Sequence, residues 1–173
     1  PPMVKVTLEG ELRPGVTGKD VIVTLCGLYN QGEVLNCAVE FTGPGVASLS
    51  VDERLAIANM TTEWGALVGW FPADRTTLTF LRERALVLRS RGVEGRLTDD
   101  QLARWEAQPP QSDPGAVYAA EITLDLASVS PYVSGPDSVQ VATSLDELSA
   151  RDIAVHKAYL VSCVNSRLSD LRA

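Results

Sequence analysis

Segments typical of β-strands alternate along this chain with segments typical of α-helices, and this order restricts the fold more than any other feature. Residues 4–10 alternate apolar and polar side chains and are rich in β-branched residues, which is typical of a half-buried strand. A helical pattern over residues 19–29 follows, and then a short apolar run over residues 34–42. Residues 118–126 return to a strand pattern. The order favours an α/β layered fold with a mostly parallel sheet flanked by helices.

Helix starts are marked by polar side chains that can accept hydrogen bonds from free backbone amides. Ser50 and Glu53 form a capping box, and we expect a long helix after it. Asp74 can cap a helix rich in arginine and leucine, and further capping boxes begin at Thr98 and Ser144. The charged residues in these regions, among them Arg54, the basic run over residues 82–91 and the Asp99-Asp100 pair, are interpreted as solvated helix faces and caps.

The last part of the chain predicts the start of a second α/β layer. Residues 128–135 suit a loop, residues 157–162 form a compact apolar strand pattern, and residues 166–172 begin a helix with little to cover its apolar face. We therefore expect one α/β domain over residues 1–136 and the N-terminal part of the next α/β domain over residues 137–173. We also expect the chain to be an internal piece of a larger protein.

Composition excludes two classes of partner. The chain has 173 residues of which 45% are hydrophobic, enough for one full domain, and its formal net charge is −7. An acidic surface repels phosphate backbones and anionic membranes at long range, so we expect neither as a partner. Residues 55–73 are the most apolar run, but they contain Glu63, two glycines and a proline, so we reject a transmembrane segment. No targeting segment is visible.

One helical face within residues 55–73 is unusual. On a helical wheel a face that contains Asn59 and Glu63 lies opposite a stripe of large apolar residues. The stripe consists of Ile57, Met60, Trp64, Leu67, Val68 and Phe71. Glu63 is the only charged residue in this run and has no partner four residues away. Two interpretations stay open: the carboxylate is merely exposed or bonded to a nearby hydroxyl, or this face meets another domain or a cleft.

The three cysteines differ in context. Cys26 in a helix and Cys37 in a strand are expected to be small buried hydrophobic residues. Cys163 follows the strand pattern and precedes a helix start, where backbone amides favour a thiolate, although a buried structural role is equally open. An odd, widely spaced set predicts no disulfide framework and favours a reducing compartment. His156 has no metal-ligand spacing and is interpreted as structural or surface.

Two motifs resemble the aconitase superfamily. Ser162-Cys163-Val164-Asn165-Ser166 resembles its Ser-Cys-Thr-Asn-Ser segment, and residues 57–66 are similar to its Asn-Met-x-x-Glu-x-Gly-Ala helix. Residues 18–23, 34–43 and 132–136 look like the homoaconitase branch. The resemblance covers nearly the whole chain and is weakest over residues 82–113. Val164 departs from the usual threonine, which puts one local hydroxyl hydrogen bond in doubt.

The resemblance implies a mitochondrial hydro-lyase of lysine biosynthesis by the α-aminoadipate route. Such an enzyme interconverts homocitrate, cis-homoaconitate and homoisocitrate, which are tricarboxylates, with a 4Fe-4S cluster. By the same resemblance Cys163 is a metal ligand, the first for the cluster. Asn59, Glu63, Asn165 and Ser166 then form a substrate-binding wall of the active site. Polar groups near an open iron orient water or hydroxyl, a task that suits Glu63 and Asn59.

The same resemblance implies that parts of the enzyme are missing from this chain. No Cys-x-x-Cys follows Cys163, and the family's upstream active-site residues and C-terminal swivelling domain are absent. We therefore expect the isolated chain to hold no cluster and to be inactive, with no complete catalytic set. Alternatives are a fragment of aconitase or of isopropylmalate isomerase, a non-catalytic binding module, or a stable fragment without function.

Overall fold

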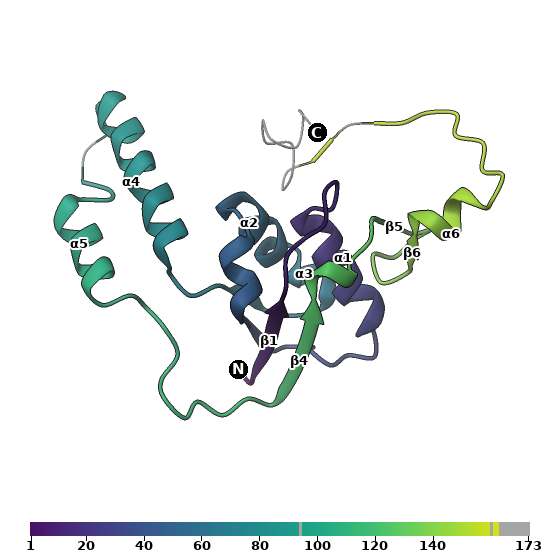
Figure 1. Cartoon of the computed structure of the whole chain (residues 1–173), viewed down its shortest axis with the longest axis horizontal. Helices are drawn as coiled ribbons and strands as arrows, with labels where there is room; N and C mark the ends of the chain where they lie inside the picture. Colours follow the sequence, from purple (N-terminus) through teal and green to yellow (C-terminus); the bar gives the residue numbers. More distant parts are fainter. Residues whose placement is uncertain (94, 160, 163–173) are drawn as a thin grey trace. The chain divides into compact units, whose positions relative to one another are not determined.

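The computed structural model describes residues 1–93, 95–159 and 161–162. Two compact units can be distinguished along the chain. The sheet unit is formed by the described residues of Pro1–Trp70 and Tyr118–Ala173, and the helical unit by those of Phe71–Val117. Each is considered by itself below, with elements labelled as in Figure 1.

A four-stranded parallel sheet forms the centre of the sheet unit. Its strands are β1 (Met3–Glu9), β2 (Ala38–Thr42), β3 (Val68–Trp70) and β4 (Ala120–Asp125), in the spatial order β3-β2-β1-β4. The two neighbours of β1 are both parallel to it, and Figure 1 shows β1 and β4 side by side. The predicted α/β architecture with a parallel sheet flanked by helices is confirmed.

The core lies on one face of this sheet. Alternate residues of β1 and β4 are fully or almost fully buried, whereas those between them are half-buried or exposed. This is the pattern expected for strands with one closely packed face. The buried strand residues are Val4, Val6 and Leu8 of β1 and Ile122 and Leu124 of β4.

Helix α1 (Gly18–Leu28) agrees with the predicted helix over residues 19–29 and is buried over most of its surface. Its start is fixed by a capping box in which Asp20 Oδ2 accepts hydrogen bonds from the Thr17 backbone amide at 2.8 Å and from the Thr17 hydroxyl at 3.0 Å. Asp20 Oδ1 also accepts a hydrogen bond from the Tyr132 amide at 3.3 Å. One carboxylate thus caps α1 and ties it to residues more than a hundred positions later.

The long helix predicted after Ser50 is wrong. The chain forms α2 (Val51–Asn59), a separate four-residue helix α3 (Thr61–Trp64) and then strand β3. Gly65 ends α3 in the left-handed conformation with φ 103°, which a side chain would disfavour. The predicted buried stripe holds at its first members but fails at Leu67 and Val68, which are exposed because they lie beyond the helix.

Gly69 explains why a strand can run here. A Cβ atom at this position would lie 2.9 Å from Ala58 Cα and 2.8 Å from Thr61 Cγ2, so β3 packs directly against the end of α2 only without a side chain. Residues 65–69 therefore determine where the helix ends and the strand begins.

Arg54 also departs from its predicted role as a solvated residue. It is only 4% exposed, and it donates hydrogen bonds from Nε to the Leu49 carbonyl at 3.1 Å and from Nη2 to the Val46 carbonyl at 2.8 Å. These carbonyls belong to a loop that contains the short 3-10 helix η1 (Pro44–Ser48). The guanidinium satisfies backbone acceptors of an irregular segment that has no regular ladder to do so.

The helical unit consists of α4 (Arg75–Ser90) and α5 (Asp99–Ala107). The predicted caps are confirmed: Asp74 accepts from the Thr77 amide and Thr98 from the Gln101 amide. Few side chains are buried, and ion pairs of Arg89 with Asp99 at 2.5 Å and of Arg82 with Glu106 join the two helices. The buried residues of α4 and α5 are Leu78, Ala85 and Leu102.

A two-stranded antiparallel ribbon follows β4 and the 3-10 helix η2 (Leu126–Ser128). It pairs β5 (Tyr132–Ser134) with β6 (Ala142–Ser144), so the loop predicted over residues 128–135 is wrong in its second half. The reason is non-local, because each strand has three residues and is stabilised by the other. The ribbon spans residue 136, and the domain boundary placed there stays a prediction.

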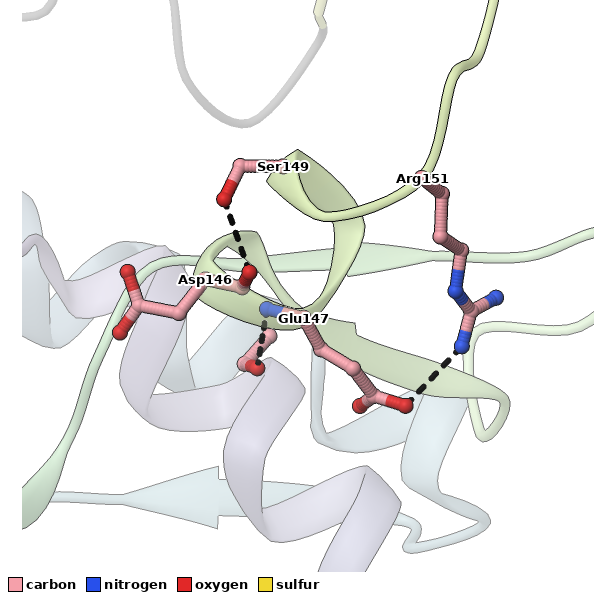
Figure 2. A network of polar contacts seen from close by, with 5 residues as sticks. Asp146, Glu147, Ser149 and Arg151 are labelled. Atoms are coloured by element: carbon pink, nitrogen blue, oxygen red, sulfur yellow. Dashed lines mark hydrogen bonds and ion pairs between the residues drawn. The ribbon is translucent and has the colours of Figure 1, made fainter.

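Helix α6 (Leu145–Ser149) begins at the predicted cap, where Ser144 Oγ accepts from the Glu147 amide at 3.2 Å. Figure 2 shows this turn with two further contacts: the Ser149 hydroxyl donates to the Asp146 carbonyl, and Arg151 pairs with Glu147. Local side-chain bonds thus stabilise a helix of only five residues.

The strand predicted over residues 157–162 is not present in the described part of that segment. Residues 157–159 and 161–162 have no regular structure, and Tyr159 and Val161 are both 77% exposed. A strand pattern forms a strand only beside another strand that can take its backbone hydrogen bonds. The helix predicted over residues 166–172 lies outside the described residues. Among the helices that are described, none is both long and apolar enough to cross a membrane.

Candidate functional site at the amino edge of the sheet

Asn59 and Glu63 lie where α2 ends and α3 turns toward β3. Helix α2 starts beyond the carboxyl end of β2, and the parallel strand β3 starts after α3, so α3 lies at the amino ends of the strands. Hydrogen bonds from the Asn36 amide to the Gly65 carbonyl at 3.0 Å and from the Leu67 amide to the Cys37 carbonyl at 2.8 Å fix this placement. Ligands of open α/β sheets usually lie at the opposite, carboxyl edge.

Two buried residues hold α3 in place. Thr61 is fully buried and its hydroxyl donates to the Ala58 carbonyl at 2.8 Å. Trp64 is 2% exposed, its Nε1 donates to the Tyr29 carbonyl at 2.7 Å, and the two aromatic rings lie 6.3 Å apart. With both ends anchored, the two residues between them, Thr62 and Glu63, are presented to solvent.

The Glu63 carboxylate is exposed and bonded to a hydroxyl. Its Oε2 accepts a hydrogen bond from Thr62 Oγ1 at 2.7 Å. Within residues 1–93, 95–159 and 161–162 it forms no ion pair, and Oε1 has no hydrogen-bond partner. This geometry agrees with the simpler of the two interpretations from sequence, and it also leaves one carboxylate oxygen open to a ligand.

Asn59 is the last residue of α2 and is exposed. Its backbone carbonyl accepts a hydrogen bond from the Thr62 hydroxyl at 3.1 Å, whereas its side-chain amide bonds to no residue in the described part of the chain. The amide offers one acceptor and two donors to a ligand. Asn59 and Glu63 are thus brought to one edge, by a chain turn rather than by the single helix face expected from sequence.

Cys26 is fully buried in α1, as predicted. Burial, together with the smaller effect of the negative charge of Glu63, raises the pKa of its thiol to about 12. The thiol is therefore protonated at neutral pH, as expected for a buried structural cysteine. Cys37 is also buried, and its Sγ lies 3.6 Å from the Leu35 carbonyl. Both cysteines have the structural character expected from sequence.

No cluster site is formed by the residues that the structure describes. No group of three or more His, Cys, Asp or Glu side chains among them could hold a metal ion. His156 lies on an exposed segment without regular structure. Cys163, Asn165 and Ser166 lie outside the described residues, so their predicted roles remain predictions.

Two exposed leucines lie on this edge and were not found by sequence reasoning. Leu35 is 61% exposed and lies against Gly65, with its Cδ1 3.6 Å from the position of a Cβ there. Leu67 is 55% exposed and was assigned to a buried stripe. The signal that could have revealed Leu67 was the pair of glycines at 65 and 69, which end a helix and open a strand.

Comparison with known proteins links this chain to one family. The family model described as "Aconitase family (aconitate hydratase)" matches residues 1–173. A mitochondrial homoaconitase of Debaryomyces hansenii is 54% identical over 173 residues, which is 100% of this chain and 25% of the relative. A mitochondrial homoaconitase of Aspergillus oryzae is 55% identical over 183 residues, which covers 100% of this chain and 24% of the relative. A third, of Mycosarcoma maydis, is 54% identical over 187 residues, which covers 100% of this chain and 25% of the relative.

The chain spans about a quarter of the length of these relatives. The similarity is nevertheless continuous through both units and includes the Asn59 and Cys163 segments. Since the family model matches every residue, the chain belongs to the aconitase family.

Proposed function

We propose that this chain forms part of a homoaconitase, a mitochondrial hydro-lyase of lysine biosynthesis. The observation that carries the proposal is the identity of 54–55% over the whole chain to relatives of that name. In the proposed reaction homocitrate loses water to give cis-homoaconitate, and water adds back at the neighbouring carbon to give homoisocitrate.

Within that enzyme we assign the amino edge of the sheet to one wall of the active site. Glu63 Oε1 and the Asn59 amide, both open to a ligand, would bind and orient the hydroxyl or water that leaves and returns. Asn165 and Ser166 would line the same site, and Cys163 would supply one thiolate ligand to a 4Fe-4S cluster. A bound cluster supplies a Lewis-acid iron for the substrate hydroxyl and carboxylate. Its other ligands would come from parts of the enzyme beyond this chain.

Exposed apolar residues beside the wall support a site that is closed by other parts of a longer enzyme. Leu35 and Leu67 lie at the same edge as Glu63 and are both more than half exposed. Large apolar side chains gathered at one edge are typical of surfaces that another domain covers. The proposed partners are therefore the upstream region and the C-terminal swivelling domain of the same enzyme, together with a tricarboxylate substrate.

The test uses the whole enzyme that carries this chain, with its cluster reconstituted. Assays with homoaconitate, aconitate and isopropylmalate should show the highest kcat/KM for homoaconitate. Glu63→Gln should lower kcat about a hundredfold or more, because a neutral amide cannot exchange the proton. Glu11→Gln, at an exposed carboxylate remote from the edge in sequence, is the matched control and should leave kcat unchanged.

Two results would contradict the proposal. A preference for isopropylmalate or aconitate would assign the chain to another branch of the family, and an unchanged kcat in Glu63→Gln would remove Glu63 from the site. The isolated chain offers a separate check on the cluster. We expect no stoichiometric cluster absorbance after iron and sulfide are added to it, because it holds one candidate ligand.

A further inference from the structure

The Thr62 hydroxyl lies between the two residues of the proposed wall. Its Oγ1 is 2.7 Å from Glu63 Oε2 and 3.1 Å from the backbone carbonyl oxygen of Asn59. A hydroxyl has a single hydrogen to donate, so it serves one of these two acceptors at a time. The carboxylate is charged and closer, and charge-assisted hydrogen bonds are the stronger kind. The hydroxyl therefore donates to Glu63 while that residue is ionised.

We propose that Thr62 is the positioning residue for Glu63: its hydroxyl occupies Oε2 and so presents Oε1 to the reacting water or hydroxyl. This inference rests on the proposed function for the role of Glu63, but not for the contact itself. It adds a residue whose hydroxyl acts through the carboxylate rather than on the substrate.

The backbone around Thr62 makes such control effective. Thr61 and Trp64 are buried and anchor the turn on both sides by side-chain hydrogen bonds, so the Thr62 backbone is fixed. The Glu63 side chain is long and exposed, and it would otherwise sample several rotamers. Because Thr62 is β-branched, its own χ1 rotation is restricted, and its hydroxyl offers a fixed donor. The restricted Thr62 side chain thus limits the rotamers that the Glu63 side chain can adopt.

A change of protonation releases the contact. When Glu63 takes up a proton during turnover, its negative charge is lost and the advantage of the shorter hydrogen bond falls. The Thr62 hydroxyl can then donate to the Asn59 carbonyl, the local bond that a threonine at this spacing readily forms. Position 62 therefore offers a donor that favours the ionised carboxylate without holding it permanently.

The kinetic test compares Thr62→Val, which keeps the shape and removes the hydroxyl, with Thr62→Ser, which keeps the hydroxyl. In the reconstituted whole enzyme Thr62→Val should lower kcat about tenfold with KM changed less than twofold, and Thr62→Ser should restore most of the loss. Thr123→Val, at an exposed threonine of β4, is the control and should match the unmodified enzyme. In the Glu63→Gln background Thr62→Val should cause no further loss.

Each result that contradicts the proposal has its own meaning. A rise in KM with kcat unchanged would make Thr62 a substrate contact, and an equal loss with and without the Glu63 carboxylate would make its effect independent of Glu63; either overturns the proposal. If the unmodified enzyme does not hydrate homoaconitate, the proposed function fails instead.

A readout without activity then decides on Thr62. In the unmodified isolated chain, NMR scalar couplings of the Glu63 side chain should report one dominant rotamer. In Thr62→Val the couplings should be averaged over several rotamers, and in Thr62→Ser they should return to the original values. Unchanged couplings in Thr62→Val would overturn the positioning role whatever the enzyme does.

Discussion

The sheet unit and the helical unit are stabilised in different ways. In the sheet unit, helix α1 buries seven of its 11 residues. In the helical unit, α4 is longer, with 16 residues, but only Leu78 and Ala85 are buried. Burial of apolar surface is the main source of stability, and exposed ion pairs such as that of Arg89 with Asp99 contribute little. We therefore expect the unit that carries the proposed wall to be the more stable of the two.

The two units also differ in net charge. Over the full sequence, residues 71–117 contain seven of the 15 basic and seven of the 22 acidic residues, so the net charge of −7 comes from the rest of the chain. A tricarboxylate is an anion and needs cationic partners. The wall at Asn59 and Glu63 has none within ion-pair distance in the described part of the chain. In the proposed enzyme this wall handles the proton and the water, and the charges that bind the substrate come from outside these residues.

The largest expected effect contrasts the tryptophans of the two units. Trp64 is buried and hydrogen-bonded, so Trp64→Ala should lower the free energy of unfolding by about 3–5 kcal/mol. Trp105 of α5 is only partly buried, and Trp105→Ala should lower it by about 1 kcal/mol. Urea unfolding followed by circular dichroism measures both. Equal losses would contradict the difference between the units.

An intermediate effect comes from the buried thiol of the sheet unit. The pKa of Cys26 is raised from 9.0 to about 12 in the folded chain, so the folded state holds a proton that the unfolded state loses first. The stability that the protonated thiol contributes is present in full below pH 9 and is lost as the pH rises toward 12. The free energy of unfolding should fall by up to about 1.4 kcal/mol per pH unit in this range. Urea unfolding between pH 8 and pH 11 should show this fall.

The control for this slope is a pair of alanine variants. Cys26→Ala should remove the part of the slope that belongs to the buried thiol, whereas Cys37→Ala leaves Cys26 in place and should keep it. If Cys26→Ala showed the same slope as the unmodified chain, the fall in stability would have another origin.

Sequence patterns predicted the features that depend on neighbours along the chain. The strand at residues 4–10 and the caps at Asp74, Thr98 and Ser144 were correct because alternation and capping are local. The helix across residues 55–73 was wrong because its end depends on the left-handed turn at Gly65 and on the pairing of β3 with β2. A helical wheel represents neither the left-handed turn nor the strand pairing.

The same distinction applies to the candidate site. Asn59 and Glu63 could be singled out from sequence, since an isolated carboxylate on an apolar stretch is visible in the residues themselves. Thr62 could not, because its role depends on a side-chain rotamer and on two distances. Arg54 was taken for a solvated charge because its acceptors are carbonyls of a loop, which no charge pattern reveals.

The smallest expected effect compares two equivalent helix caps, one in each unit. Ser50 Oγ accepts from the Glu53 amide at 3.2 Å in the sheet unit, and Thr98 Oγ1 accepts from the Gln101 amide at 3.3 Å in the helical unit. Each Ser or Thr to Ala change should destabilise its helix by about 1 kcal/mol. Ser50 Oγ also donates to Glu53 Oε2 at 2.8 Å, so the informative difference is which amides respond to each change rather than the size of the two losses.

Hydrogen exchange separates the two cases. In Ser50→Ala the slowest amides of β1 and α1 should exchange about fivefold faster, because α2 opens only with the core. In Thr98→Ala the faster exchange should be confined to α5 and α4, because a helix pair with three buried side chains opens without the sheet. Ser50→Thr and Thr98→Ser keep the hydroxyl and should restore both patterns. Acceleration of the β1 amides in Thr98→Ala would show that the two units unfold together, and the difference in burial would then not set their stability.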